Sequence, residues 1–209
     1  HGTSDKEAML KGSRIHRKIQ RQMGANYQAE VALKKTTEYD DLILQIEGRA
    51  DGILRENEEI TIDEIKGIYK DVWKMEAPYD IHLAQAKCYA LIYGEQEQLE
   101  QISVTMTYAN LDTEEIRRFK SKYSLEELQK WYENLLNEYH KMQEEYAFNK
   151  TDEMLKQLHL VKLKLDSNEN VINYKKAYKE YQLLVGQITD IVFEGFSNPS
   201  LLDKIVRAK

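Results

Sequence analysis

Cysteine is scarce in this 209-residue sequence, where Cys88 is the only one. A single cysteine excludes an internal disulfide, a zinc site made of thiolates and a four-cysteine iron–sulfur cluster. A G-x-x-x-x-G-K-[ST] loop is also missing, so the chain lacks that phosphate-binding signature of an ATPase. No apolar run approaches the roughly 20 residues that cross a bilayer, and no charged-then-apolar leader opens the sequence. We therefore expect a cytoplasmic protein that does not enter a membrane.

The charge is acidic overall and basic at one end. The formal net charge is −6, which argues against a nucleic-acid partner. However, residues 1–35 contain eight Lys or Arg against three acidic residues. Because phosphate contacts are local, this basic segment could bind DNA. A solvated helix face is the ordinary alternative for a run of charges.

The spacing of apolar residues predicts one α/β domain followed by helices. A hydrophobic content of 42% is enough for a sizeable core. We expect a helix over 5–23, strands over 29–35, 40–54 and 59–70, a helix over 79–93 closed by Gly94, and a strand over 101–111. These elements predict a mixed β-sheet flanked by helices over residues 1–111. Residues 112–209 are predicted to form a helical extension that packs on this core.

The predicted extension has two helix-start signals and one long apolar stripe. Asp112 with Glu115, and Ser124 with Glu127, have the spacing of capping boxes. The stripe that follows predicts packing on the core in preference to a partner-binding face. A further helix is expected over 173–193. The stripe consists of Leu128, Trp131, Leu135, Tyr139, Met142 and Tyr146.

The segment "GRADGILRENEEITIDEIKG" (48–67) places carboxylates on two adjoining strands. If the strands form a hairpin that turns between Asn57 and Glu58, Asp51 lies opposite Glu64. Cross-strand neighbours on one face have Cβ atoms about 5 Å apart, so both carboxylates could reach one cation. Lys66 is two residues beyond Glu64 and should point to the same side of the strand.

Two carboxylates so close would resist ionisation unless a positive charge lay between them. Hard oxygen ligands suit Mg²⁺ or Mn²⁺, ions whose usual further ligands are substrate phosphates. Such an ion could polarise a phosphodiester while Lys66 stabilises developing charge. The alternative is a salt-bridge cluster of Asp51, Glu64, Lys66 and Arg49 on a solvated sheet face, which would add little stability.

Four motifs occur in order around this hairpin: "GSRIH" at His16, "GRADGI" at Asp51, "DEIKG" at Glu64 and Lys66, and the Q-x-x-x-Y of Gln85 and Tyr89. Together they resemble the PD-(D/E)xK nuclease superfamily, in its RecB-like branch, over about residues 8–110. The resemblance implies a restriction-endonuclease-like core. The same segments are similar to the nuclease-like N-terminal domain of some DinG-type and XPD-type DNA helicases.

The resemblance also implies a set of site residues. The metal ligands would be His16, Asp51, Glu64 and the backbone carbonyl of Ile65. Lys66 would be catalytic together with the two acids, and Gln85 and Tyr89 would bind substrate. We add Arg14 and Arg17 of the basic segment as substrate-binding residues. Gln20 departs from the pattern, because relatives often carry a glutamate one turn after the histidine.

The expected function is metal-dependent hydrolysis of DNA phosphodiester bonds, as an exonuclease-like activity in DNA repair or recombination. The expected cofactor is Mg²⁺ or Mn²⁺, and the expected partners are DNA and a helicase domain in the same or a partner chain. The alternative is a catalytically inactive nucleic-acid-binding or protein-docking module of a larger helicase. RNA is a third possible substrate, and the oligomeric state stays open.

Overall fold

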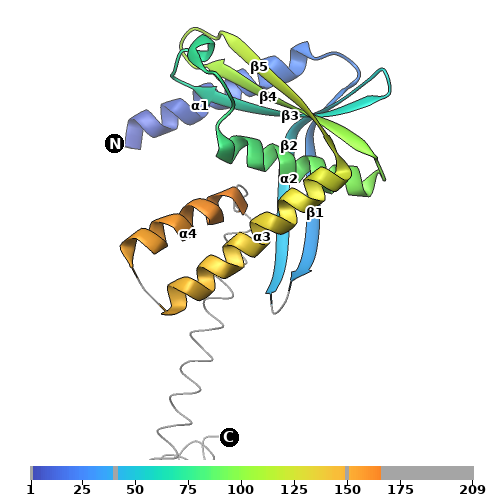
Figure 1. The fold of residues 1–209 in the computed structure, drawn as a ribbon. Coiled ribbons are helices and arrows are strands. Elements are labelled where there is room, and N and C mark those ends of the chain that lie inside the picture. The colour runs from blue at the N-terminus through green and yellow to red at the C-terminus, as the bar shows by residue number, and fades with distance from the viewer. Residues whose placement is uncertain (1, 40–41, 149–150, 166–209) are drawn as a thin grey trace, which may run out of the picture. The chain divides into compact units, whose positions relative to one another are not determined.

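The computed structural model describes residues 2–39, 42–148 and 151–165 (Figure 1). The chain divides into two compact units, residues 1–169 and 170–209. The second unit, which includes the helix predicted over 173–193, lies outside the described residues. The elements of the first unit are α1 (Gly2–Gln22), β1 (Tyr27–Tyr39), β2 (Leu42–Glu56), β3 (Glu59–Ile68), η1 (Val72–Lys74), α2 (Asp80–Gln96), β4 (Gln101–Asn110), β5 (Ile116–Ser124), α3 (Leu125–Phe148) and α4 (Asp152–Leu165).

The five strands form one mixed sheet in the order β1-β2-β3-β4-β5 (Figure 1). Strands β3 and β4 are parallel, and the other neighbours are antiparallel. A parallel pair needs a crossover, and α2 lies in the segment that joins β3 to β4. The predicted fold class, an α/β protein with a mixed sheet flanked by helices, is confirmed.

The sheet has an apolar cluster on each side. The larger cluster joins β2, β3 and β4 to α2 and α3, with Tyr89, Leu91 and Leu128 among its fully buried side chains. The smaller cluster joins Ile15 and Ile19 of α1 to Ile65 and Ala109. Alternation along β3 therefore sends Ile65 toward α1 and its neighbours Glu64 and Lys66 to the other side.

The stripe on α3 packs on the core as the sequence predicted. Leu128, Leu135 and Tyr139 are buried, and Trp131 and Met142 pack against the same cluster at partial exposure. The helix begins with the predicted capping box: the Ser124 N–H donates to the Glu127 carboxylate at 2.7 Å, and the Glu127 N–H donates to Ser124 Oγ at 3.1 Å. The side chain of Tyr146 lies outside the described residues.

The predicted helix start at Asp112 is wrong, because a turn and strand β5 follow instead. The Asn110 side-chain oxygen accepts hydrogen bonds from the N–H groups of Asp112 and Thr113, at 2.8 and 2.9 Å. Glu114 has φ 59°, and the chain then returns antiparallel to β4. Asparagine before a turn competes with helix formation in this way. The sheet therefore continues past residue 111.

Helix α2 also differs from its predicted end. It continues through Gly94 to Gln96, and Gly94 is buried inside it. A Cβ on Gly94 would lie 2.7 Å from a methyl group of Leu125, so this glycine allows the start of α3 to approach α2 closely.

Among the described residues, no helix combines the length and the apolar character that a membrane span requires. The cytoplasmic location stays a prediction.

Candidate functional site

The hairpin that carries the predicted site has the predicted register. Pairs from Gly52 with Asp63 to Glu56 with Glu59 form the antiparallel ladder. The two turn residues, Asn57 and Glu58, have φ of 50° and 63°. Positive φ at both positions is the geometry of a two-residue type I′ hairpin. The turn therefore lies where the sequence placed it, between β2 and β3.

At Asp51 the ladder of β2 is interrupted. The pairing with β3 stops at Gly52, and Asp51 is skipped in the pairing with β1, opposite Glu30 with its φ of 57°. The Asp51 side chain takes over one backbone role, since its Oδ2 accepts the Ile65 N–H at 2.7 Å. The alternation of buried side chains along β2 also shifts by one residue here. Ala50 and Ile53 are three positions apart, yet both lie in the larger apolar cluster. The carboxylate is thus held at a distortion of the strand.

Gln20 of α1 stabilises this distortion. Its side-chain amide donates to the Asp51 backbone carbonyl and to Glu30 Oε1, both at 2.9 Å. The unpaired carbonyl is satisfied in this way by a side chain from another element. A glutamate at position 20 could not make either hydrogen bond while ionised. The departure from the expected pattern at Gln20 therefore has a structural reason.

Six predicted residues form two sets of contacts that meet at Ile65, whose N–H donates to Asp51. His16 Nδ1 lies 3.2 Å from Asp51 Oδ1, and Lys66 Nζ lies 2.8 Å from Glu64 Oε1. Lys66 Nζ also donates to Gln85 Oε1 at 2.8 Å. Gln85 in turn donates to the Tyr89 hydroxyl at 3.3 Å. The structure therefore brings α1, β2, β3 and α2 together at this point, which we call the acidic cluster (His16, Asp51, Glu64 and Lys66).

Burial dominates the electrostatics of the acidic cluster. Glu64 is 2% exposed, and burial raises its pKa to about 8; Lys66 opposes this shift and the Asp51 carboxylate adds to it. Burial lowers the pKa of His16, but the hydrogen bond and charge of Asp51 and the charge of Glu64 outweigh it. The pKa of His16 therefore lies above its ordinary value. Glu64 Oε2 is buried without a hydrogen-bond partner among the described residues.

The cluster offers oxygen and imidazole donors but is not arranged as a finished metal site. In the part of the chain that the structure describes, no three His, Cys, Asp or Glu side chains stand together so as to hold an ion. Lys66 and the Ile65 N–H each engage one carboxylate oxygen. The buried, unpartnered Glu64 Oε2 is the atom that fits a cation, because such an atom is costly to leave unsatisfied.

The two predicted arginines lie apart from the acidic cluster, on the exposed side of α1. Arg14 contacts Glu114 at 3.7 Å, and Arg17 Nε donates to the Ser13 carbonyl in its own helix. Among the described residues, no ion pair or hydrogen bond joins either arginine to the cluster. Their predicted role in substrate binding stays a prediction.

A second buried carboxylate, which the sequence analysis did not identify, lies next to the cluster. Asp63 is 2% exposed and accepts hydrogen bonds from Thr107 Oγ1 at 2.6 Å and from the Tyr27 hydroxyl at 3.0 Å. A Cβ at position 52 would lie 1.8 Å from the Tyr27 ring, so only glycine leaves room for this contact. The sequence signal that could have indicated this site was Gly52, because a glycine inside a strand often marks a close approach by another group.

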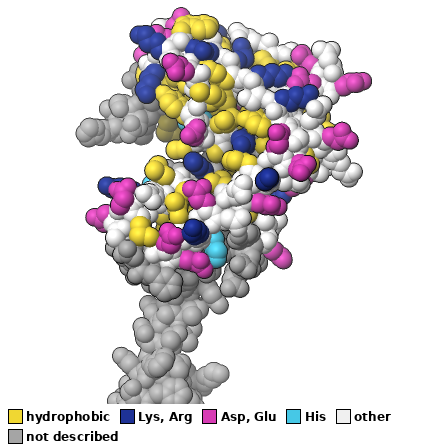
Figure 2. All heavy atoms as spheres, viewed as in Figure 1, with side chains coloured by type: hydrophobic (Ala, Val, Ile, Leu, Met, Phe, Trp, Pro, Cys, Tyr) yellow, Lys and Arg dark blue, Asp and Glu magenta, His cyan; other side chains and the backbone are white. Residues whose placement is uncertain are grey.

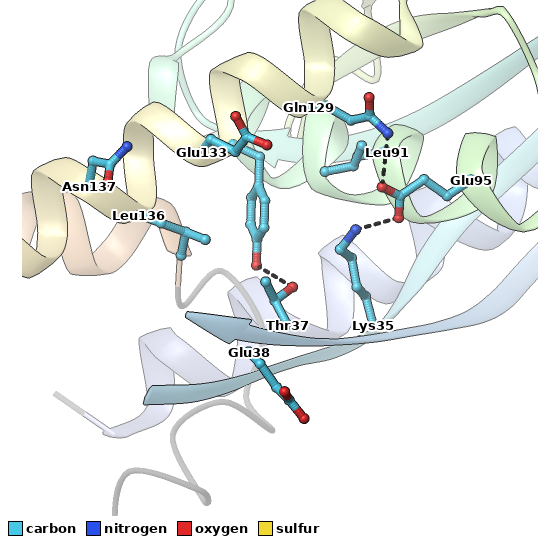
Figure 3. Close-up of a pocket in the computed structure, with 10 residues that line it drawn as sticks. Lys35, Thr37, Glu38, Leu91, Glu95, Gln129, Glu133, Leu136 and Asn137 are labelled. Atoms are coloured by element: carbon cyan, nitrogen blue, oxygen red, sulfur yellow. Dashed lines mark hydrogen bonds and ion pairs between the residues drawn. The ribbon is translucent and has the colours of Figure 1, made fainter. Parts of the chain in front are cut away.

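A separate pocket of about 360 Å³ lies between β1, α2 and α3 (Figure 3). Its polar side chains bond to one another: Lys35 and Gln129 both contact Glu95, and Thr37 contacts the Tyr132 hydroxyl. A ligand would have to displace these interactions. The pocket therefore gives no sign of a prepared binding site.

A known protein family matches part of the chain. The family described as "Control of competence regulator ComK, YlbF/YmcA" (Com_YlbF) matches residues 109–197, which is less than half of the chain. A comparison with curated proteins finds no match. Among solved structures, the chain is similar to one titled "Crystal structure of SSO0001", at 22% identity and a TM-score of 0.42. That similarity covers 55% of this chain and 50% of the other.

The family match overturns the assignment that the four motifs suggested. The predicted PD-(D/E)xK, RecB-like family is wrong, because the family whose model matches is described by its control of a competence regulator and not as a nuclease. The predicted activity, a metal-dependent deoxyribonuclease with an exonuclease role in DNA repair, is wrong for the same reason. The alternative of an inactive helicase module gains no support either. The acidic cluster itself, the cation and the DNA and helicase partners are left untested.

Proposed function

We propose that this protein is a regulatory protein that acts by binding another protein. The observation that carries the proposal is the match over residues 109–197, whose description names control of a regulator. The matched range contains β5, α3 and α4, and α3 is anchored by its buried stripe while its other side is exposed. Helices held this way present a fixed polar surface, which suits recognition of a partner.

Deletion of the gene in its native organism tests this proposal. Transcript profiling should show a defined set of genes that respond together, and the wild-type chain should restore their levels. A chain with both Lys130→Glu and Glu133→Lys, two exposed residues of α3 in the matched range, should fold normally and fail to restore them. Matched substitutions at exposed Glu97 and Gln98, outside that range, serve as the control. An unchanged transcript profile would refute the regulatory role.

We propose Mg²⁺ or Mn²⁺ as a ligand of the acidic cluster. The unpartnered Glu64 Oε2 supports this, together with Asp51, whose charge acts on Glu64, and His16, which contacts Asp51. With the Ile65 carbonyl these groups offer three oxygens and one imidazole, and imidazole favours Mn²⁺ somewhat. A bound ion would supply positive charge to two carboxylates that otherwise repel each other.

Calorimetric titration with Mn²⁺ tests the cation independently of the regulatory role. Wild type should bind, and Asp51→Asn and Glu64→Gln should lose most of the affinity because each removes a carboxylate ligand. Lys66→Met removes a competing cation and no ligand, so its affinity should stay equal or increase. Equal affinity in all four proteins would mean that the acidic cluster does not hold the ion.

A further inference from the structure

Residues of helices α2, α3 and α4 line a second pocket, of about 260 Å³, which is open to solvent on one side. On the face shown in Figure 2, hydrophobic side chains lie next to lysines and arginines where these helices meet. We call it the Lys87 pocket. It is lined by Asp80, Leu83, Ala84, Lys87, Trp131, Asn134, Leu135, Glu138 and Lys164.

Lys87 is held by aromatic rings and not by a carboxylate. Its Nζ lies 4.1 Å from the centroid of the Trp131 ring and 5.1 Å from that of Tyr123. No ion pair or hydrogen bond of the described residues involves its ammonium group. Burial lowers the pKa of Lys87, and the negative charge of Glu127 partly opposes this. The ammonium group is thus partly desolvated and fixed in place, with its capacity for an ion pair unused.

Two other partly buried lysines of the described chain have the carboxylate partner that Lys87 lacks. Lys35 contacts Glu95, and Lys66 contacts Glu64. In the pocket of Figure 3 the lysine is therefore already in an ion pair, whereas Lys87 is in no ion pair with a described residue and only a more distant carboxylate, Glu127, acts on it. A negative group entering the Lys87 pocket would find a cation without displacing a protein carboxylate.

We infer that the Lys87 pocket binds a small organic monocarboxylate, with the carboxylate on Lys87 and an apolar body against Leu83, Leu135 and Trp131. A charge-assisted hydrogen bond in a partly buried site is stronger than one in water, and the apolar wall stabilises a hydrocarbon chain. The volume of about 260 Å³ lies just below the roughly 300–1,000 Å³ of ordinary ligand sites, which suits a small molecule. Asp80 and Glu138 also line the pocket, and they disfavour a second negative charge.

Trp131 is a reporter built into the pocket, because the chain has only one other tryptophan, Trp73. In the full chain with Trp73→Phe, straight-chain carboxylates from butanoate to decanoate are titrated while Trp131 fluorescence is recorded. At least one should give a saturable change, whereas the matched primary amide and the dicarboxylate of equal length should bind at least about tenfold more weakly.

Substitutions then locate the binding. Lys87→Met should weaken binding about tenfold or more, and Lys87→Arg, which keeps the charge, should retain most of it. Lys130→Met, on an exposed position of α3, should have no effect. No saturable change with any chain length, or equal binding of carboxylate and amide, would overturn the inference. If Lys87→Met does not fold, the amide and dicarboxylate comparisons decide the matter on their own.

Discussion

Replacing Glu64 by glutamine should remove a pH dependence from the stability of the metal-free protein. Burial raises the pKa of Glu64 to about 8 from an ordinary value of 4.5. Between these values the folded state holds a proton that the unfolded state has released. The part of the unfolding free energy that is linked to this carboxyl group is therefore fully present below pH 4.5. It is lost as the pH rises from 4.5 through 8. Glutamine resembles the neutral acid and does not titrate, so the variant should lack this loss.

The size of the effect follows from the shift. Each pKa unit corresponds to about 1.4 kcal/mol, so a shift of about 3.5 units sets an upper value of about 5 kcal/mol. Because part of the titration is already complete at pH 5, wild type should lose about 3 to 4 kcal/mol between pH 5 and pH 8 through Glu64. Other titrating groups are common to both proteins and cancel in the difference. Relative to wild type, Glu64→Gln should become steadily more stable over this range.

Guanidinium denaturation at pH 5, 6, 7 and 8, with a chelator present, measures this difference. Glu97→Gln, at an exposed position on the same protein, is the control and should follow wild type at every pH. The reasoning fails if the free-energy difference between wild type and Glu64→Gln stays constant with pH, or if it falls as the pH rises. Added Mn²⁺ should reduce the loss in wild type alone, since a bound cation favours the ionised carboxylate.

Two further substitutions test the packing and capping around the site. Gly52→Ala places a Cβ where the Tyr27 ring lies, so Tyr27 should be displaced from Asp63 at a cost of about 3 kcal/mol, measured by chemical denaturation. A cost below about 0.5 kcal/mol would show that the ring can move freely. Ser124→Ala removes the N-cap of α3 and should cost about 1 kcal/mol, while Ser124→Asp should restore most of it. Equal stability of the alanine and aspartate variants would argue against the cap.

The hairpin was predictable because its signals are local. Two strands of alternating character flank a short polar turn, and pairing then follows from counting residues outward from Asn57 and Glu58. The start of α3 was predictable for the same reason, since Ser124 and Glu127 are three residues apart. In both places the residues that decide the structure are neighbours in sequence.

What the sequence did not reveal depends on contacts between distant segments. The interruption at Asp51 is satisfied by Gln20, 31 residues away, and Asp63 is satisfied by Thr107, 44 residues away. The turn at Asp112 has the local spacing of a helix start, but Asn110 takes the N–H groups that a helix would need and β4 provides a partner for the returning strand. Tertiary pairing therefore overrode a local signal.

The four motifs suggested a nuclease because they place polar residues in order, but several of those residues also have structural contacts. Asp51 replaces a backbone acceptor for Ile65, and Gln85 holds Lys66 while contacting Tyr89. Such contacts require these residue types whether or not a reaction takes place. Glu64 is different. In a network whose role is purely structural, every buried oxygen is expected to have a hydrogen-bond partner, but Glu64 Oε2 has none among the described residues. That atom is the observation behind the proposed cation, and it is independent of the family match over residues 109–197.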